Sequence, residues 1–125
     1  MIDAVGLGRR YGARWALRGI ETRVDRAELL GVVGPDGSGK TTLMQMLAGI
    51  LDPSEGTCRV FGQDTRRDAK DIARRLGYMT QGFTLYDRLS VEEILRLAGD
   101  LRGLDRTTYA DRRARLLAMA GLERF

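Results

Sequence analysis

The chain has 125 residues, which is enough for one hydrophobic core and too few for two. Its 43% hydrophobic and 30% charged residues are ordinary for a globular protein and favour neither a disordered nor a fibrous class. Its net charge of +4 comes from arginines interleaved with acidic residues, which favours a solvated surface over a nucleic-acid-binding face. One cysteine and no histidine exclude disulfides, zinc clusters and Cys/His or Ser/His catalytic groups.

The first half of the chain predicts strands, a glycine-rich loop and a helix. Residues 2–7 and 18–24 are expected to form short strands, and the continuous apolar run at 29–33 predicts a parallel strand buried on both faces. The glycine-rich residues 34–42 follow. Apolar residues then recur at helical spacing as far as Asp52-Pro53, where the proline ends the predicted helix.

The second half predicts alternating turns, strands and helices. In chain order we expect turns or loops at 54–56, 62–64 and 80–89, strands at 57–61 and 76–79, and helices at 68–75 and from Thr107 to Ala120. Ser90-x-x-Glu93 is a capping box, which predicts a further helix start because each side chain satisfies a backbone amide of the other residue. Gly121 is the expected C-terminal stop of the last helix.

The glycine-rich segment fits the P-loop pattern Gly34-x-x-x-x-Gly39-Lys40-Thr41. Its glycines allow backbone amides to approach a phosphate, Lys40 is expected against the β- and γ-phosphates, and the Thr41 hydroxyl is a predicted ligand of Mg²⁺. A glycine-rich turn could match by chance, but a match between a predicted strand and helix favours phosphate binding. The predicted binding residues of the loop are Gly34, Pro35, Asp36, Gly37, Ser38, Gly39, Lys40, Thr41 and Thr42.

Further segments resemble the nucleotide-binding domain of ABC transporters over essentially the whole chain. They are Tyr11–Ile20, which is similar to the family's A-loop, the segments Leu51–Thr57 and Val60–Asp64 after the P-loop helix, and Gly77–Gln81 with Leu85–Glu93, which resemble the Q-loop. The resemblance implies that Tyr11 stacks on the adenine of ATP. It also implies that Gln81 contacts Mg²⁺ and that its loop faces a transmembrane permease subunit.

The resemblance implies an α/β fold class: a P-loop NTPase core with an antiparallel β-subdomain and the start of a helical subdomain. Residues 1–125 then form the amino-terminal part of one ATP-binding domain, which is incomplete. The family's signature, Walker B aspartate, catalytic glutamate and switch histidine have no counterparts, so no catalytic residue is assigned and no ATP turnover is expected of the chain alone. The absent Walker B strand would leave the predicted strand partly uncovered at Leu29, Leu30, Val32 and Val33.

The family also implies partners and a location. We expect a second ATP-binding domain in a head-to-tail dimer, which energises membrane transport. We expect the transport to be export, because the sequence of the Q-loop resembles that of the drug- and antibiotic-exporting branch of the family. No nucleic acid is expected as a partner. The apolar runs are too short to span a bilayer and the first residues lack a secretory signal, so we expect a cytoplasmic chain at the inner face of the membrane.

Some residues depart from the family pattern, and other functions stay open. Asp36 and Thr80 replace the usual Asn and Pro, and Ala27 stands at a common glycine turn, where a left-handed backbone is less comfortable for it. The alternatives are a non-transport ABC ATPase of translation or DNA repair, another P-loop protein such as a GTPase or small-molecule kinase, and a glycine-rich α/β interaction module. The GTPase reading is weakened by the lack of an Asn-Lys-x-Asp motif.

Overall fold

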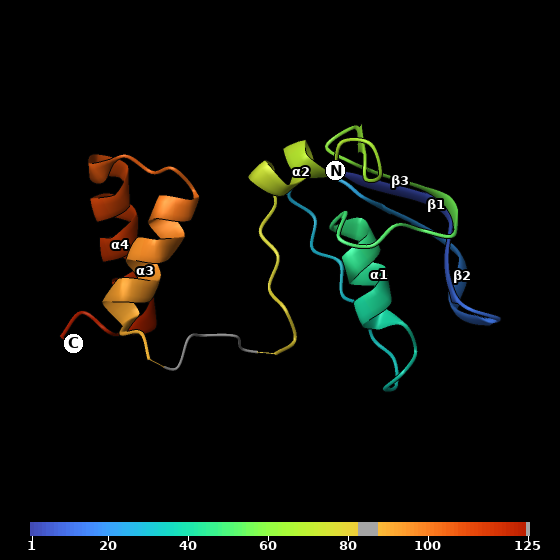
Figure 1. Cartoon of the computed structure of the whole chain (residues 1–125), viewed down its shortest axis with the longest axis horizontal. Coiled ribbons are helices and arrows are strands. Elements are labelled where there is room, and N and C mark those ends of the chain that lie inside the picture. Colours follow the sequence, from blue (N-terminus) through green and yellow to red (C-terminus); the bar gives the residue numbers. More distant parts are fainter. Residues whose placement is uncertain (83–87, 125) are drawn as a thin grey trace. The chain divides into compact units, whose positions relative to one another are not determined.

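The computed structural model describes residues 1–82 and 88–124, and it divides into two compact units, Met1–Gln81 and Gly82–Phe125. The first unit contains a β-sheet with helices α1 and α2, and the second contains helices α3 and α4 (Figure 1). In the part of the chain that the structure describes, none of the helices has both the length and the apolar character needed to cross a bilayer.

The first unit is built on a four-stranded antiparallel sheet with the strand order β2-β1-β3-β4. The strands are β1 (Ile2–Tyr11), β2 (Arg14–Val24), β3 (Glu55–Val60) and β4 (Gln63–Asp64). The sheet confirms the expected antiparallel β-subdomain. Its first two strands are longer than predicted because the segment that follows residue 7 continues into a hairpin in which Tyr11 pairs with Arg14.

Irregular pairing bends the β1–β2 hairpin. Arg9 pairs with Leu17 and Arg10 pairs with Trp15, so Ala16 is an extra residue on β2 and forms a β-bulge. A second irregularity lies at Gly6, whose φ of 57° is comfortable only for glycine. Ala16, the residue at the β2 bulge, lies against Gly39 of the glycine-rich loop.

Helix α1 (Lys40–Leu47) is shorter than the predicted helix, which was expected to reach Asp52. The prediction was wrong because Gly49, with a φ of 69°, ends the helix before the proline does. The amide of Gly49 donates to the Met46 carbonyl at 3.1 Å and that of Ile50 donates to the Gln45 carbonyl at 2.9 Å. This pair of bonds is a Schellman motif, which satisfies the last carbonyls of the helix.

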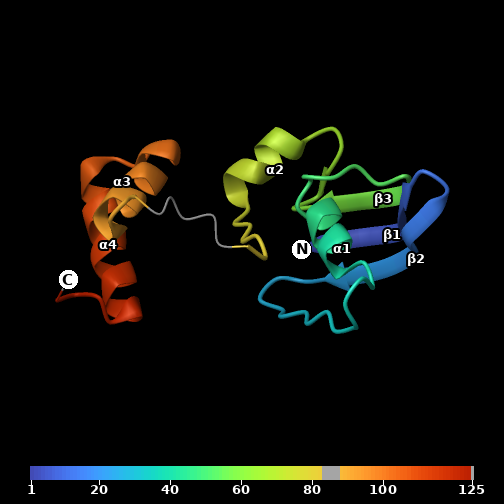
Figure 2. The same ribbon diagram turned by 60° about the horizontal axis from the view of Figure 1, so that its bottom comes forward.

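The hydrophobic core lies between α1, the sheet and α2 (Ala69–Arg75), and Figure 2 shows α1 lying across the strands. The buried residues of this core are Ala4, Leu7, Leu43, Met46, Leu47, Cys58, Val60 and Ile72. The buried residues of α1, Leu43, Met46 and Leu47, lie in its middle and at its end, so the helix is anchored to the core beyond its first turn.

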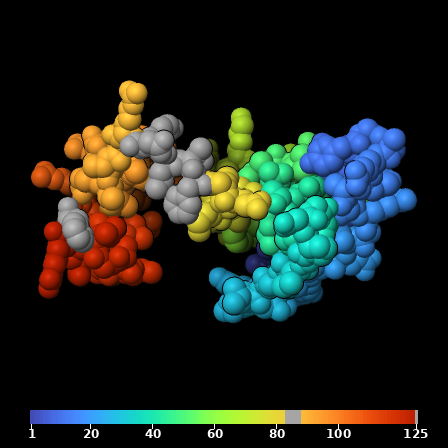
Figure 3. Space-filling view, turned by 90° about the horizontal axis from the view of Figure 1, so that it is seen from below, coloured from blue at the N-terminus to red at the C-terminus, as the bar shows by residue number. Residues whose placement is uncertain are grey.

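Two predicted strands are absent. Residues 29–33 and 76–79 are not in strands, and they pair with no strand within residues 1–82 and 88–124. An apolar run becomes a strand only where a neighbour supplies its hydrogen bonds. The expected loss of cover is confirmed at Leu29 and Val33, which are 97% and 96% exposed, but not at Val32, which packs against the core. Figure 3 shows the light-blue chain around residue 30 at the surface of this unit.

The predicted turn at 62–64 begins one residue earlier and contains a strand. Phe61 and Gly62 form a two-residue hairpin loop, in which both have positive φ, and β4 follows directly. Ala27 also adopts the left-handed conformation, with a φ of 61°, so the departure from a glycine turn is accommodated with backbone strain.

The second unit is a pair of helices, α3 (Val91–Leu101) and α4 (Arg106–Ala120). The predicted capping box is confirmed: the Glu93 amide donates to Ser90 Oγ at 3.3 Å, and the Ser90 amide donates to Glu93 Oε2 at 2.8 Å. Asp105 caps α4, and Gly121 ends it with a φ of 66° as expected. Glu92 joins the helices by accepting from Tyr109 Oη at 3.2 Å and from Arg113 Nε at 2.6 Å.

Candidate functional site

The glycine-rich loop connects the unpaired apolar run to the start of α1. Gly37 and Gly39 have φ values of 77° and 92°, which residues with a Cβ rarely adopt. The Ser38 amide donates to the Pro35 carbonyl at 3.2 Å and so closes a turn. The loop therefore curls back before α1 begins at Lys40, with the free amides of the helix start at its inner end.

Gly39 lies in close contact with the β1–β2 hairpin. A Cβ on Gly39 would lie 2.8 Å from the Ala16 carbonyl oxygen and 3.2 Å from Leu17 Cδ2, which is closer than side chains pack. The bulge at Ala16 brings this carbonyl to the loop. Glycine is therefore required here for two reasons, the left-handed φ and the close approach of the hairpin.

The side chain of Lys40 bridges the two ends of the loop. Its Nζ donates to the carbonyl oxygens of Gly34 at 2.7 Å and Pro35 at 2.8 Å. The ammonium thus joins the first residue of α1 to the first two residues of the loop. The contacts hold the cation at the concave side of the loop, where an anion would find backbone amides and a positive charge together.

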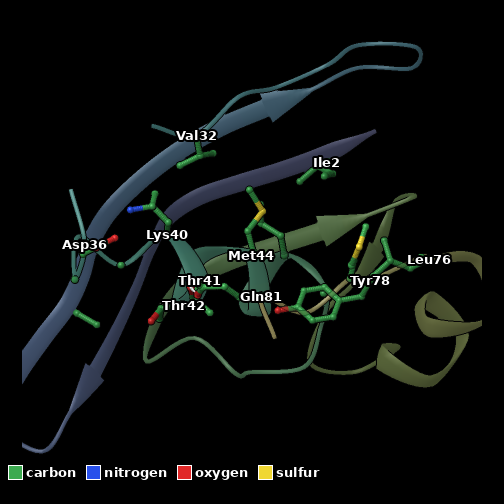
Figure 4. Close-up of a pocket in the computed structure, with 17 residues that line it drawn as sticks. Ile2, Val32, Asp36, Lys40, Thr41, Thr42, Met44, Leu76, Tyr78 and Gln81 are labelled. Carbon is green, nitrogen blue, oxygen red and sulfur yellow. Dashed lines mark hydrogen bonds between the residues drawn. The ribbon is translucent and has the colours of Figure 1, made fainter. Parts of the chain in front are cut away.

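Thr41 and Gln81 lie side by side although they are forty positions apart in sequence. The Thr41 hydroxyl donates to Gln81 Oε1 at 3.4 Å, which is a long hydrogen bond, and Figure 4 shows both side chains at the same wall of the cavity. These are the two residues predicted as ligands of Mg²⁺. The structure brings their oxygen atoms together next to the loop.

A cavity of about 850 Å³ lies against the loop, a size typical of small-molecule sites. Polar residues of the loop and of the 77–81 segment line it, together with Val32 of the apolar run and apolar residues from the sheet, α1 and the predicted strand at 76–79 (Figure 4). The predicted site residues that line it are Asp36, Gly37, Gly39, Lys40, Thr41, Thr42 and Gln81. Gly34, Pro35 and Ser38 are not part of the lining, and they shape the loop through their hydrogen bonds with Lys40 and with each other.

Tyr11 is not brought into this cavity. It is the last residue of β1, its ring is half exposed, and the guanidinium of Arg9 lies over the ring at 5.0 Å from its centroid. Its partner in the sheet is Arg14, two residues before Ala16. Tyr11 therefore lies near the end of the hairpin that touches the loop, outside the cavity lining.

Sequence reasoning missed Ala16, which lines the cavity and contacts Gly39. No sequence signal could have found it, because the bulge depends on the register between two strands. Of the Q-loop-like stretch, residues 85–87 lie outside the described residues, so only its first part and its helix start are placed.

The residues present fit a bound nucleotide phosphate. The loop offers amides at positions where a Cβ would either clash or force an unfavourable φ, one ammonium group, and the start of an eight-residue helix. The neighbouring oxygens of Thr41 and Gln81 are hard donors of the kind that Mg²⁺ prefers.

Comparison with known proteins gives consistent relatives. The probable multidrug ABC transporter ATP-binding protein YbhF of Escherichia coli is 40% identical over 131 residues, covering all of this chain and 23% of that protein. The daunorubicin resistance ATP-binding protein DrrA3 of Streptomyces coeruleorubidus is 40% identical over 124 residues, covering 99% of this chain and 38% of that protein. The chain thus spans well under half the length of these curated relatives.

Solved structures agree with this result. The structure of an ATP-binding subunit of an ABC transporter superposes with a TM-score of 0.86 at 30% identity, covering 99% of this chain and 52% of that one. The dimeric structure of a bacterial ABC transporter cassette superposes with a TM-score of 0.83 at 25% identity, covering 100% and 60%. The sequence model of the ABC transporter family matches residues 17–125, and the chain belongs to that family.

Proposed function

We propose that the chain binds ATP with Mg²⁺ and forms the amino-terminal part of one ATP-binding domain in an ABC-type ATPase that energises membrane transport. The observation that carries the proposal is the loop closed by Lys40, with Thr41 and Gln81 in contact beside it. Family membership supports ATP over the ligands of other P-loop classes.

Phosphate binding would exchange one set of bonds at Lys40 for another. The ammonium leaves the carbonyls of Gly34 and Pro35 and donates to phosphate oxygens, while the loop amides donate to the same anion. Hydrogen bonds to a charged partner contribute roughly 1.5–3 kcal/mol each, more than the neutral carbonyl contacts that they replace. Several of them support micromolar affinity, about 8 kcal/mol.

Thr41 and Gln81 would hold the metal. Bound Mg²⁺ supplies positive charge that neutralises the phosphates. Thr41 would offer its hydroxyl oxygen and Gln81 its amide oxygen, and the weak bond of 3.4 Å between them costs little to give up. Both side chains therefore bind and orient, and neither takes a proton.

Tyr11 would provide the stacking surface for adenine. The hairpin that carries it contacts Gly39 through Ala16, and the ring and the loop belong to the same compact unit. Stacking uses the face of a ring and not the hydrogen-bonding edge of a base. Tyr11→Ala should therefore weaken ATP and GTP to similar degrees, and Tyr11→Trp should be tolerated. Unaltered binding by Tyr11→Ala would return Tyr11 to a packing role.

The partners follow from the family. We propose that the segment around Gln81 meets a transmembrane component at the cytoplasmic face of the membrane, and that a second ATP-binding domain associates head to tail. The names of YbhF and DrrA3 support export, whereas a methionine import ATP-binding protein of Bordetella avium, MetN, is 33% identical over 131 residues. MgATP-driven movement of a labelled drug or methionine in vesicles that contain the assembled transporter distinguishes the two directions.

The central test is a titration of MgATP into Lys40→Ala. Removing the only cation of the loop leaves phosphate charge uncompensated, so the affinity should fall at least about tenfold, or 1.4 kcal/mol. Lys70→Ala is the matched control, since Lys70 is the other lysine, is exposed in the first turn of α2, and should leave binding unchanged. Equal affinities of Lys40→Ala and the unaltered chain would remove the phosphate-loop assignment.

A further inference from the structure

We propose that Arg9 is a positioning residue for nucleotide binding. Its guanidinium covers one face of the Tyr11 ring and is fastened to the chain that follows α1, so that the ring offers its other face to a base. The inference rests on the proposed stacking role of Tyr11, and it adds a residue that the sequence pattern did not single out.

The contact between Arg9 and Tyr11 follows from strand geometry. The two residues are two positions apart on β1, and side chains at this spacing point to the same face of a strand. The guanidinium carbon lies 5.0 Å from the ring centroid, within the range of a cation–π interaction. The ring is 50% exposed, so the guanidinium does not enclose it.

The guanidinium is fixed from its other side. Arg9 Nη1 donates to the carbonyl oxygen of Asp52 at 2.7 Å. Around it, the Ser54 amide donates to the Gly8 carbonyl at 2.8 Å, and the Arg10 amide donates to Ser54 Oγ at 3.1 Å. Residues 52–54 are thus bound to β1 at three successive positions, and Arg9 extends this attachment to the aromatic ring.

The side chain of Arg9 also contains a buried nitrogen, Nε, that has no hydrogen-bond partner among the described residues. An unpaired buried donor is unfavourable, so a freely rotating arginine would turn this atom to water. The guanidinium is held in this position by the Asp52 carbonyl and the Tyr11 ring.

The neighbouring aromatic residue is less suited to stacking. Trp15 lies within 4.8 Å of the Arg18 guanidinium and 5.7 Å of the Arg10 guanidinium, and Arg18 also pairs with Glu55 at 3.0 Å. Two cations already engage the Trp15 ring, whereas Tyr11 has one. The hairpin therefore leaves more ring surface free at Tyr11.

The arrangement connects the proposed base and phosphate contacts. Asp52 follows the end of α1, and α1 begins at Lys40 in the loop. Arg9 thus ties the ring to the segment that follows the helix whose first residues would bind phosphate. A ring that is already oriented loses less conformational freedom when a base stacks on it, so the fixed geometry favours binding.

The test compares Arg9→Gln with Arg10→Gln, an adjacent substitution with the same change in charge. MgATP and inorganic tripolyphosphate, which has no base, are titrated into each folded variant. Arg9→Gln should weaken MgATP about threefold to fivefold and leave tripolyphosphate unchanged, whereas Arg10→Gln should change neither. Unchanged MgATP binding, or equal weakening of both ligands, would overturn the role of Arg9.

Two further variants distinguish the role of Arg9 from the stacking role of Tyr11 on which it depends. In a Tyr11→Ala background, Arg9→Gln should cause no additional loss, because the ring it positions is gone. If Tyr11→Ala weakens MgATP and Arg9→Gln does not, only the Arg9 proposal fails. If Tyr11→Ala has no effect, the stacking role fails first. Should Arg9→Gln not fold, Arg9→Lys replaces it, with about a twofold loss for MgATP expected and no loss overturning the proposal.

Discussion

Two apolar regions of the first unit differ in burial: one forms the core and the other is largely exposed. The residues of β1, β3 and α1 pack into a core in which Leu7 and Met46 are fully buried, while Leu29 and Val33 in the run before the glycine loop are almost fully exposed. The sequences of both regions are equally suited to burial. They differ in their neighbours, since β1 is hydrogen-bonded on both edges and residues 29–33 pair with no strand among the described residues.

The glycine loop is held mainly by the packed region, and within the apolar run Val32 alone packs against the core while Leu29 and Val33 are exposed. Its helical end is held by the core through α1, and its Gly39 is held by the hairpin through Ala16. Its other end is attached to the uncovered run. The loop therefore keeps its shape through local contacts and through Lys40, without support from a parallel strand.

Truncating one residue in each region gives the largest expected effect. Met46→Ala removes a buried side chain and leaves a cavity, so the free energy of unfolding should fall by roughly 2–5 kcal/mol. Leu29→Ala, at a residue that is 97% exposed, should change it by less than about 0.5 kcal/mol. Urea unfolding measures both, and similar losses would show that the apolar run is packed in solution.

The reactivity of Cys58 tests how tightly the core is packed. Burial raises the pKa of its thiol from 9.0 to about 11. A shift of this size lowers the thiolate fraction about a hundredfold near pH 8, so iodoacetamide should label the folded chain far more slowly than the chain in urea. The same shift predicts stability that is complete below pH 9 and is lost as the pH rises toward 11. Rapid labelling of the folded chain would contradict the packed core.

Ala27 tests the turn through which the chain enters the uncovered run. Its left-handed backbone, with a φ of 61°, is strained for alanine and comfortable for glycine. Ala27→Gly should therefore raise the free energy of unfolding by about 0.5–1 kcal/mol after the entropy cost of glycine. Ala13→Gly is the control, because Ala13 lies outside the left-handed region and should show a small loss. A loss for both would show that the turn relaxes in solution.

The smallest effect concerns the second unit, where capping contacts replace a buried core. Hydrogen bonds from the Ser90 side chain and amide lower the pKa of Glu93 below 4.5, and those from the Thr108 side chain and amide lower that of Asp105 below 3.8. Their contribution is present above these ordinary values and is lost as the pH falls through the lowered ones. Circular dichroism should show reduced helix content in acid, and Glu93→Gln with Asp105→Asn should remove this pH dependence.

The sequence allowed the loop and its helix start to be predicted because their chemistry is local. The order of glycines, Lys40 and Thr41 is contiguous, and the Ser90 capping box spans four residues. The same reasoning placed strands at 29–33 and 76–79 because apolar composition reports a tendency to be buried and not the presence of a partner. The contacts of Ala16 and Arg9 could not be predicted, since the first depends on the register between β1 and β2 and the second on the approach of Asp52 to β1.

The bulge at Ala16 also determines where the chain tolerates a change in length. An insertion in the turn at Gly12 and Ala13 would lengthen the hairpin beyond the bulge and leave Ala16 against Gly39. Deleting Ala16 would instead let Trp15 and Leu17 face Arg10 and Arg9 as consecutive pairs, so the sheet would keep its register while the contact of the Ala16 carbonyl with Gly39 was lost. The two changes in length lie a few residues apart but have different effects, because only the deletion removes the contact between Ala16 and the glycine loop.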